Sequence, residues 1–353
     1  MNRKFILPFF LIFQIVFLKI IVFFPEVVER FYSNGLYIFI SRFSRTVLGS
    51  IPFSVGDIIY GILIIYLIFT LWKTRTSWKL QWKNNLLKII SIVSIAYFLF
   101  HLLWAFNYYR MPLFEKMNIK REYTEAELVV FTEKLITKTN AIQIQITKNK
   151  EVKVSNPYSQ DQIFEMTQKG YNNLGKQYDF FNYEIPSRKK SLFSLPLTYM
   201  GFGGYLNPFT NEAQVNDKIP IFGFPAVTTH EMAHQMGFAS ESECNFIGFL
   251  ACVKNEDLYF QYSAYSNALR YCMSNIGMKN ESQFEVLKKK INKGILANYK
   301  ETDVFWNSYD TIIDKGFHAF YDQFLKMNQQ KDGLESYSKF VDLLINYYSN
   351  RNL

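Results

Sequence analysis

Two of the four histidines in the chain stand four residues apart, in the stretch His230-Glu231-Met232-Ala233-His234. On a helix, residues at positions i and i+4 share one face, so the two imidazoles can bind one metal ion. Glu231 lies beside them, where its carboxylate can reach a water molecule at the ion. Zinc in such a site lowers the pKa of water to about 7 and polarises a carbonyl group. The motif therefore predicts hydrolysis in which Glu231 accepts the proton of water and passes it to the leaving amine.

The surroundings of this motif favour a metal site over two histidines packed in a protein core. A chance HExxH is expected about 0.002 times in a chain of this length and composition. Val227 and Met236, with the two residues inside the motif, give the predicted helix an apolar back. Gly237 follows, and glycine often ends a helix in the left-handed conformation. The spacing therefore predicts a short helix with both histidines on one face.

A catalytic zinc site needs a third protein ligand. Metzincins place a histidine six residues after the second histidine of the motif, where this chain has Ser240, so it lacks a metzincin site. The carboxylates nearby are those of Glu241 and Glu243. Ser240-x-x-Glu243 predicts a capping box, which would engage Glu243 with its own backbone. Glu241 is therefore the predicted third ligand, with Glu243 as the alternative. Asn245 is expected to support a ligand by hydrogen bonding.

The stretch 191–216, "SLFSLPLTYMGFGGYLNPFTNEAQVN", differs from its helical surroundings. Its glycines, prolines and interleaved aromatic residues predict short strands and turns. Zinc peptidases commonly hold substrate as an added strand on a sheet edge, and 199–216 is the expected edge here. Glu212 and Asn216 are candidates to line that cleft, or alternatively to close turns.

The reaction also needs a hydrogen-bond donor opposite Glu231 to stabilise the oxyanion. Tyr205, His318 and Tyr321 are the candidate donors for substrate or oxyanion. A structural role is the alternative for His318.

Most of the chain beyond residue 110 has the periodicity of helices. Residues 122–140, "EYTEAELVVFTEKLITKTN", predict an amphipathic helix that begins at a Thr-x-Ala-Glu sequence. Further helices are predicted at 158–176, 225–237, 240–254, 256–275, 281–296, 302–326 and 334–349. The three cysteines, Cys244, Cys252 and Cys272, are too few for a disulfide framework. The expected fold class is mainly α, with a small β edge.

Three apolar stretches, at about 5–24, 54–72 and 86–106, are long enough to cross a bilayer. A cleaved signal peptide is the alternative for the first stretch, and buried core helices are the alternative for the others. Their length and low charge favour membrane helices. Trp72, Trp78, Trp82 and Trp104 fit an aromatic belt at the membrane surface. We expect a membrane domain, 1–109, followed by a second domain, 110–353, with membrane lipid as a partner.

The positive charge of the chain is concentrated in its apolar part. Residues 1–109 hold 11 Lys or Arg and 3 Asp or Glu, a net +8, whereas residues 110–353 hold 28 and 27, a net +1. This distribution argues against nucleic acid as a partner and for a membrane surface.

The basic residues also predict an orientation. Arg3 and Lys4 precede the first span, and the connection 73–85 carries four basic and no acidic residues. Positive-inside reasoning places both in the cytoplasm. The chain after Arg110 is then expected on the periplasmic or extracellular side of a multi-pass inner (cytoplasmic) membrane protein. The loop 25–53 is moderately apolar and is expected on the membrane surface.

The stretch Glu241-Ser-Glu-Cys-Asn245 resembles the E-x-x-A-[DN] element of gluzincin peptidases. In those enzymes the first glutamate binds zinc and the last residue supports the site. The connection from the histidine motif is shorter here than is usual in those families.

Nearly the whole chain resembles a bacterial membrane family catalogued as domain of unknown function 3810. The stretches that carry the likeness are "IPFSVGDIIYG", "GFGGYLNPFTNEAQVN", "HEMAHQMGFASESECNFIGFLAC" and "YDQFLKMNQQKDGLESYSKFVDLL". The resemblance implies three membrane helices followed by a zincin-like domain, with no assigned substrate.

We therefore expect a membrane-anchored zinc metallopeptidase of the HExxH type, with a peptide or protein as substrate. The alternative is a non-catalytic zinc-stabilised membrane scaffold or sensor, in which a base beside the ligands would have no purpose. An intramembrane protease is a third interpretation. Because the motif lies over a hundred residues beyond the last apolar stretch, in a region of balanced charge, cleavage inside the bilayer is not expected.

Overall fold

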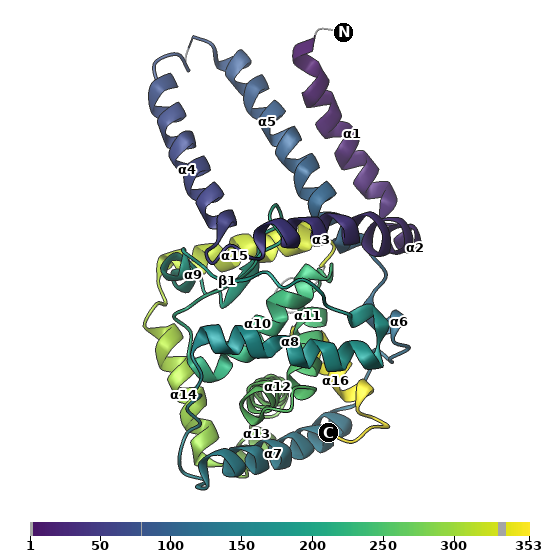
Figure 1. Ribbon diagram of the computed structural model, residues 1–353, viewed down its shortest axis with the longest axis vertical. Coiled ribbons are helices and arrows are strands. Elements are labelled where there is room, and N and C mark those ends of the chain that lie inside the picture. The colour runs from purple at the N-terminus through teal and green to yellow at the C-terminus, as the bar shows by residue number, and fades with distance from the viewer. Residues whose placement is uncertain (1–2, 79, 331–336) are drawn as a thin grey trace.

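Three long apolar helices stand on one side of the molecule (Figure 1). The computed structural model describes residues 3–78, 80–330 and 337–353. Within them α1 (Ile6–Ile21), which follows the short η1 (Arg3–Phe5), α4 (Val55–Thr74) and α5 (Trp82–Leu103) are long and apolar enough to cross a membrane. They confirm the predicted apolar stretches. The third ends at Leu103, because Trp104 leaves the helical conformation with φ −154° and ψ −46°.

The N-terminal end of α1 and the turn between α4 and α5 lie together, at the end of the helices away from the rest of the chain (Figure 1). If the three helices cross a membrane, this arrangement is the one expected for a basic tip and a basic α4–α5 connection on the same side of it.

A reporter that is active only outside the cytoplasm is therefore expected to be active when fused after Arg110. The same reporter fused after Ser77 is the matched control and is expected to be silent, because Ser77 lies in the basic connection. Activity from the Ser77 fusion and none from the Arg110 fusion would invert the proposed orientation.

The chain between the first two spans is helical, which corrects the predicted loop at 25–53. It forms α2 (Pro25–Val27), the π-helical η2 (Val28–Leu36) and α3 (Tyr37–Leu48). The buried carboxylate of Glu29 in η2 accepts hydrogen bonds from Arg110 and Lys116, each at 2.8 Å. Burial by itself would raise the pKa of Glu29, but these two cations lower it to about 2. This ion cluster fixes η2 to the chain that follows the third span.

Helices also dominate the chain after the spans. In order they are η3 (Ala105–Tyr109), α6 (Leu113–Lys116), α7 (Glu125–Thr147), α8 (Gln160–Gln177), η4 (Asp179–Phe181), α9 (Ser194–Tyr199), η5 (Ile221–Gly223), α10 (Phe224–Gln235), α11 (Glu241–Val253), α12 (Leu258–Lys279), α13 (Glu281–Lys288), α14 (Lys293–Asn307), α15 (Ile312–Met327) and α16 (Tyr337–Tyr347). The predicted Thr-x-Ala-Glu start of α7 is a capping box between Thr124 and Glu127. The mainly α fold class is confirmed.

Three predicted helices differ from those observed. The predicted helix 281–296 is divided between α13, which ends at Lys288, and α14, which begins at Lys293. The predicted helix 302–326 is two helices, α14 and α15, because Thr311 is extended (φ −132°, ψ 175°) and separates them. The predicted helix 334–349 is α16 where it is described, and its residues 334–336 lie outside the described part of the chain.

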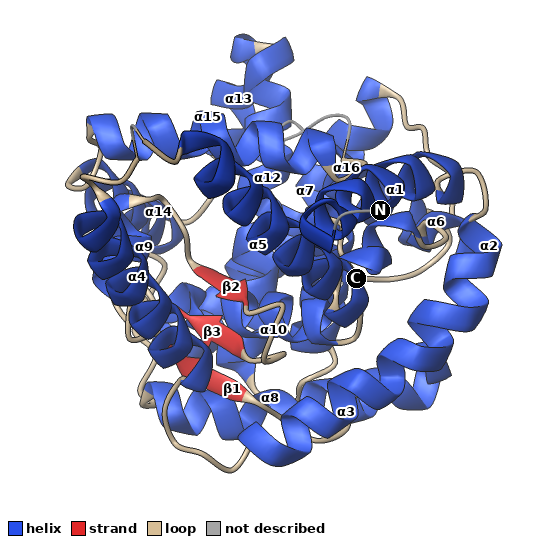
Figure 2. Ribbon diagram, turned by 90° about the horizontal axis from the view of Figure 1, so that it is seen from above, coloured by secondary structure: helices blue, strands red, loops and turns tan. Residues whose placement is uncertain are grey.

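The predicted β edge is a three-stranded sheet in the described residues. Its strands are β1 (Arg188–Lys190), β2 (Gly204–Leu206) and β3 (Ala213–Val215), in the order β1-β3-β2. Strand β1 runs parallel to β3, and β2 runs antiparallel to it, with Tyr205 opposite Gln214. Figure 2 shows the sheet beside α10, which carries the histidine motif, with β2 at one edge.

Two clusters of buried apolar side chains hold the molecule together. The larger packs α7, α8, α10, α11, α12 and α16 against one another. The smaller joins residues from both sides of the predicted domain boundary: Leu18, Val28, Tyr32, Tyr37, Trp104, Ala105, Tyr109 and Ala239. Ala239 lies in the connection between α10 and α11, so the helix pair of the histidine motif is packed on the first 109 residues as well as on the later helices.

Candidate metal centre

Helix α10 presents both histidines of the motif on one face. Pro225 stands in its first turn, where a missing N–H costs nothing. The helix ends at Gln235, and Gly237 just beyond it has φ +84°; a Cβ there would lie 2.9 Å from the ring of Tyr37. The Nε2 atoms of His230 and His234 are 3.1 Å apart. Ligand atoms of these histidines and of Glu231 lie within 4.8 Å of one another, a group that could hold a metal ion.

Glu241 completes this group from the first position of α11. Its Oε2 atom lies 3.1 Å from Nε2 of His230 and 3.7 Å from Nε2 of His234. Burial by itself would raise the pKa of Glu241, but the two histidines hold it well below its usual range. The carboxylate is therefore an anion, the form that binds a cation.

The second nitrogen of each imidazole meets a hydrogen-bond acceptor. Nδ1 of His230 lies 2.9 Å from Oδ1 of Asn245, and Nδ1 of His234 lies 2.8 Å from the carbonyl oxygen of Phe238. Because a carbonyl oxygen can only accept, Nδ1 carries the proton and Nε2 keeps its lone pair for the centre. Asn245 thus lies where the sequence predicted a supporting residue, with His230 as its partner.

Asn245→Ala is expected to lower the metal affinity of the full chain by about 10–100-fold, the usual effect of losing a residue that orients a metal ligand. The affinity would be measured by competition with a metal chelator. Asn173→Ala is the control, because Asn173 lies on an exposed part of α8, where it bonds the carbonyl of Lys254. Equal affinity of both variants and the wild type would show that His230 needs no such support.

Glu231 is buried beside the centre and lies against the sheet edge. A Cβ at Gly204, the first residue of β2, would stand 2.8 Å from its Oε1 atom, so glycine is what lets the strand approach. Its Oε2 atom is buried without a hydrogen-bond partner in the described residues. Burial raises the pKa of Glu231 to about 7, against the opposing effect of the two histidines.

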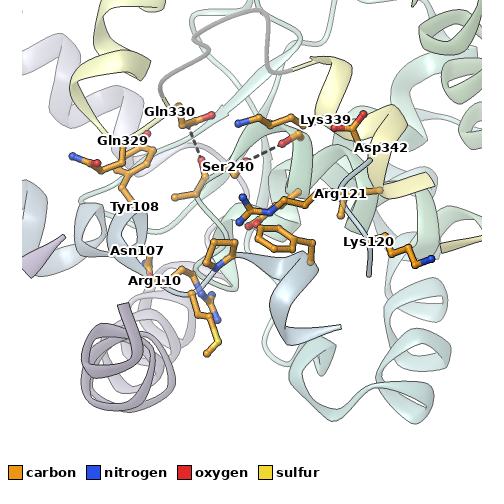
Figure 3. A pocket seen from close by; sticks show the side chains of 17 residues that line it. Asn107, Tyr108, Arg110, Lys120, Arg121, Ser240, Gln329, Gln330, Lys339 and Asp342 are labelled. Atoms are coloured by element: carbon orange, nitrogen blue, oxygen red, sulfur yellow. Dashed lines mark hydrogen bonds between the residues drawn. The ribbon is translucent and has the colours of Figure 1, made fainter. Parts of the chain in front are cut away.

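Glu243, the alternative third ligand, is directed at the start of α6 and not at the two histidines. The predicted capping box is wrong: the Ser240 side chain does not cap α11, and Oε1 of Glu243 accepts a hydrogen bond of 2.6 Å from the backbone N–H of Leu113. That N–H begins α6 and has no partner within its own helix, so a carboxylate satisfies it. Glu243 also lines a separate cavity of about 260 Å³ between Arg110, Ser240 and Lys339 (Figure 3).

Three other predicted residues lie in the sheet region, where their side chains bond to the scaffold. The hydroxyl of Tyr205 donates to Asp57 at the start of α4. Glu212 accepts hydrogen bonds from the backbone of the same helix start, 3.1 Å from Val55 N and 2.6 Å from Gly56 N. The amide of Asn216 donates to Thr198 Oγ1 at 2.9 Å and to the carbonyl of Phe202 at 3.0 Å. Together these bonds attach the second span to the sheet and close a turn.

Helix α15 carries two of the predicted donors, and one of them reaches the centre. The hydroxyl of Tyr321 donates to Oε1 of Glu241 at 2.7 Å. His318 lies 3.2 Å from Asp314 on the same helix, stacks against Phe202 and is 43% exposed. Of the three donor candidates, Tyr321 is thus the one in contact with the metal-binding group.

A family model described as "Protein of unknown function (DUF3810)" matches residues 32–345, and so covers the centre, α4, α5 and α15. The chain belongs to this family. No curated protein matches the chain, and no solved structure matches it.

Two residues from the membrane part touch the centre, and the sequence did not point to them. The indole N–H of Trp104 donates to the carbonyl of His234 at 3.2 Å, and the hydroxyl of Tyr37 donates to the carbonyl of Gln235 at 3.0 Å. Both bind carbonyls in the last turn of α10, where that of His234 also accepts from the N–H of Gly237 at 3.0 Å. Trp104 is 5% exposed, which corrects its predicted place in an aromatic belt. Its position near the end of the predicted apolar stretch 86–106 was the available sign in the sequence, and it favoured the aromatic belt.

Proposed function

We propose that this protein is a membrane-anchored zinc metallopeptidase. The observation that carries the proposal is Glu231: a buried carboxylate whose Oε2 atom has no partner in the described residues, beside two histidines and a second glutamate. An unsatisfied buried carboxylate opposes folding, and such groups concentrate where chemistry needs them. A scaffold or sensor with a structural zinc site would gain nothing from a buried carboxylate without a hydrogen-bond partner.

The donor atoms suit zinc. A tetrahedral zinc ion with bonds of about 2.0–2.1 Å holds its ligand atoms roughly 3.3–3.5 Å apart. The separations among the two Nε2 atoms and Oε2 of Glu241 are 3.1, 3.1 and 3.7 Å, on both sides of that range. Two histidines and one glutamate with a fourth position open form a catalytic donor set, whereas structural zinc is closed by four side chains.

The chain's own residues then divide the reaction between them. Zinc, when bound, would polarise the substrate carbonyl and make water acidic. Oε2 of Glu231 accepts the proton of the attacking water and later donates it to the nitrogen of the leaving amine. A single carboxylate beside the attacking water can do both, as a base in the first step and as an acid in the second. The Tyr321 hydroxyl holds Oε1 of Glu241, which leaves Oε2 directed at the histidines.

The sheet edge offers a place for a peptide. Strand β2 pairs with β3 on one side only within the described residues, and it touches Glu231 through Gly204. A peptide added to that edge would place its backbone beside the proposed base. A cavity of about 170 Å³ adjoins the start of β2 at Gly203 and the first turn of α10 at Val227, and its size suits one side chain. The orientation predicted from the basic residues puts this site on the periplasmic or extracellular side of the cell membrane.

The proposal predicts that metal removal stops peptide hydrolysis by the full-length protein. The purified chain in lipid vesicles would be incubated with a mixed peptide library, before and after treatment with a chelator, and cleavage would be followed by mass spectrometry. Hydrolysis is expected before the chelator is added, should stop after treatment, and should return when Zn²⁺ is restored. Cleavage that survives metal removal, or a zinc-loaded protein that cleaves no peptide, would contradict the proposed function.

A further inference from the structure

Two helices expose apolar side chains where the three long helices meet the rest of the chain. On α3 the exposed residues are Phe39, Phe43 and Val47, which are 52–73% exposed and spaced so that they share one face. On α15 they are Ile312, Ile313, Phe320 and Met327, which are 59–90% exposed. The opposite sides of these helices are buried on the protein, through Ser41 and Arg45 in α3 and Leu325 in α15.

Both helices lie at the same level. Figure 1 shows α3 and α15 lying across the base of α1, α4 and α5. Figure 2, which looks along those three helices, shows α3 and α15 on opposite sides of the molecule, with the sheet and α10 between them. Phe324 of α15 packs against Phe100 in the last turn of α5, with ring centroids 6.2 Å apart. The exposed faces therefore continue the apolar surface of the long helices.

The metal centre lies directly under this level. Trp104 is the first residue after α5, Tyr37 is the first residue of α3 and Tyr321 belongs to α15. Each donates a hydrogen bond into the centre or the end of its helix, to His234, Gln235 and Glu241 respectively. Since a helix with its side chains is about 10 Å across, the centre is roughly one helix diameter from the plane of α3 and α15.

We propose that the exposed faces of α3 and α15 bind the surface of the lipid bilayer, and that the centre therefore acts on polypeptide segments next to the membrane. The substrate class is the juxtamembrane segment of a membrane-anchored polypeptide. Lipid is the occupant that the continuity with the long apolar helices favours, because an interfacial helix buries such a face at the boundary of the acyl chains. The substrate class rests on the proposed peptidase function, whereas the binding of lipid does not.

Spin labels test the binding of lipid without any reaction. Single labels would be placed by Phe39→Cys, Phe320→Cys and Met327→Cys, in full-length protein reconstituted in phosphatidylcholine–phosphatidylglycerol vesicles. The three native cysteines are buried, so the new thiols would react selectively. Val130→Cys on α7 is the control, because Val130 is 53% exposed on a helix at the far end of the molecule from the spans (Figure 1).

The labels at 39, 320 and 327 are expected to be accessible to oxygen and protected from a water-soluble nickel chelate, with the label at 130 showing the reverse. Nickel accessibility at all three positions equal to that at 130 would overturn the proposal. Circular dichroism melts of the labelled variants would show that each is folded. The labels at 320 and 327 both lie on α15, so they should give the same result.

A tethered substrate tests the second half of the proposal. A peptide that the enzyme cleaves would be joined to a single transmembrane helix, either directly or through a rigid spacer of about 20 prolines, which extends roughly 60 Å. Cleavage is expected to fall at least about tenfold with the spacer, since a semi-rigid spacer holds the peptide beyond reach. Equal cleavage of both would overturn the proposed substrate class and leave the peptidase intact. Protected labels with no cleavage of any peptide would instead overturn the peptidase, and the substrate class with it.

Discussion

Glu231→Gln is expected to abolish peptide hydrolysis while leaving metal binding intact. Glutamine keeps the shape of the side chain and cannot accept the proton of the attacking water. Removal of a general base lowers rates by roughly 10²–10⁴-fold, so turnover should fall at least about 100-fold. The measurement is cleavage of one identified peptide by wild type and variant in vesicles, with the metal content of both determined by mass spectrometry.

The control for this substitution is Glu256→Gln, which makes the same change at an exposed ion pair with Lys169 and should keep full activity. Wild-type turnover in the Glu231 variant would refute its role as the base. If the variant lost both the metal and its activity, Glu231 would be a metal ligand and not the general base.

Glu241→Ala is expected to remove most of the bound metal, and Glu243→Ala is expected to keep it. Oε2 of Glu241 lies within 3.7 Å of both Nε2 atoms, whereas Glu243 is engaged with the backbone of Leu113. Loss of a direct ligand should exceed the 10–100-fold effect of losing a supporting residue, so the affinity should fall more than about 100-fold. The affinity of each variant would be measured by chelator competition at equal protein concentration.

Glu243→Ala is itself informative because it leaves the N–H of Leu113 without its acceptor. Its melting temperature should fall while its metal affinity stays near that of the wild type, since an unsatisfied buried donor costs about 1–3 kcal/mol. Metal loss in the Glu243 variant with retention in the Glu241 variant would overturn the assigned third ligand.

Those features of the fold and of the centre that depend on near neighbours in the sequence could be predicted from spacing. The i, i+4 relation of His230 and His234 depends only on helix geometry, and the structure places their Nε2 atoms 3.1 Å apart. The apolar helices followed from length and hydropathy in the same way, and Gly237 has the left-handed φ of +84° expected at a helix end. Such predictions succeed because the interacting groups are near neighbours along the chain.

The choice of Glu241 over Glu243 stays a prediction, and one of the reasons for it was wrong. A capping box was expected to engage Glu243, and instead a backbone N–H from the distant Leu113 does so. Local capping rules do not include partners 130 residues away. The placement of Glu241 beside the histidines follows from the tight turn at Gly237 and the direction in which α11 leaves it.

Contacts from distant segments could not be predicted from spacing. Tyr321 is 80 residues beyond Glu241, and Trp104 is 130 residues before His234. The sequence named Tyr321 as a candidate donor and Trp104 as part of an aromatic belt, but spacing predicted neither Glu241 nor His234 as the partner. Their roles arise because α15 and the residue that follows α5 reach the helix pair α10 and α11, and this placement depends on the whole fold.

The central claim is that one zinc ion is held by His230, His234 and Glu241 beside an unliganded Glu231. The most direct measurement is zinc-edge X-ray absorption of the full-length protein, compared with its Glu241→Ala and Glu243→Ala variants. One zinc per chain is expected, with two imidazole nitrogens and a carboxylate oxygen, in a spectrum that changes with Glu241→Ala and not with Glu243→Ala. A protein that binds no zinc, or a spectrum without imidazole that ignores both substitutions, would contradict the account.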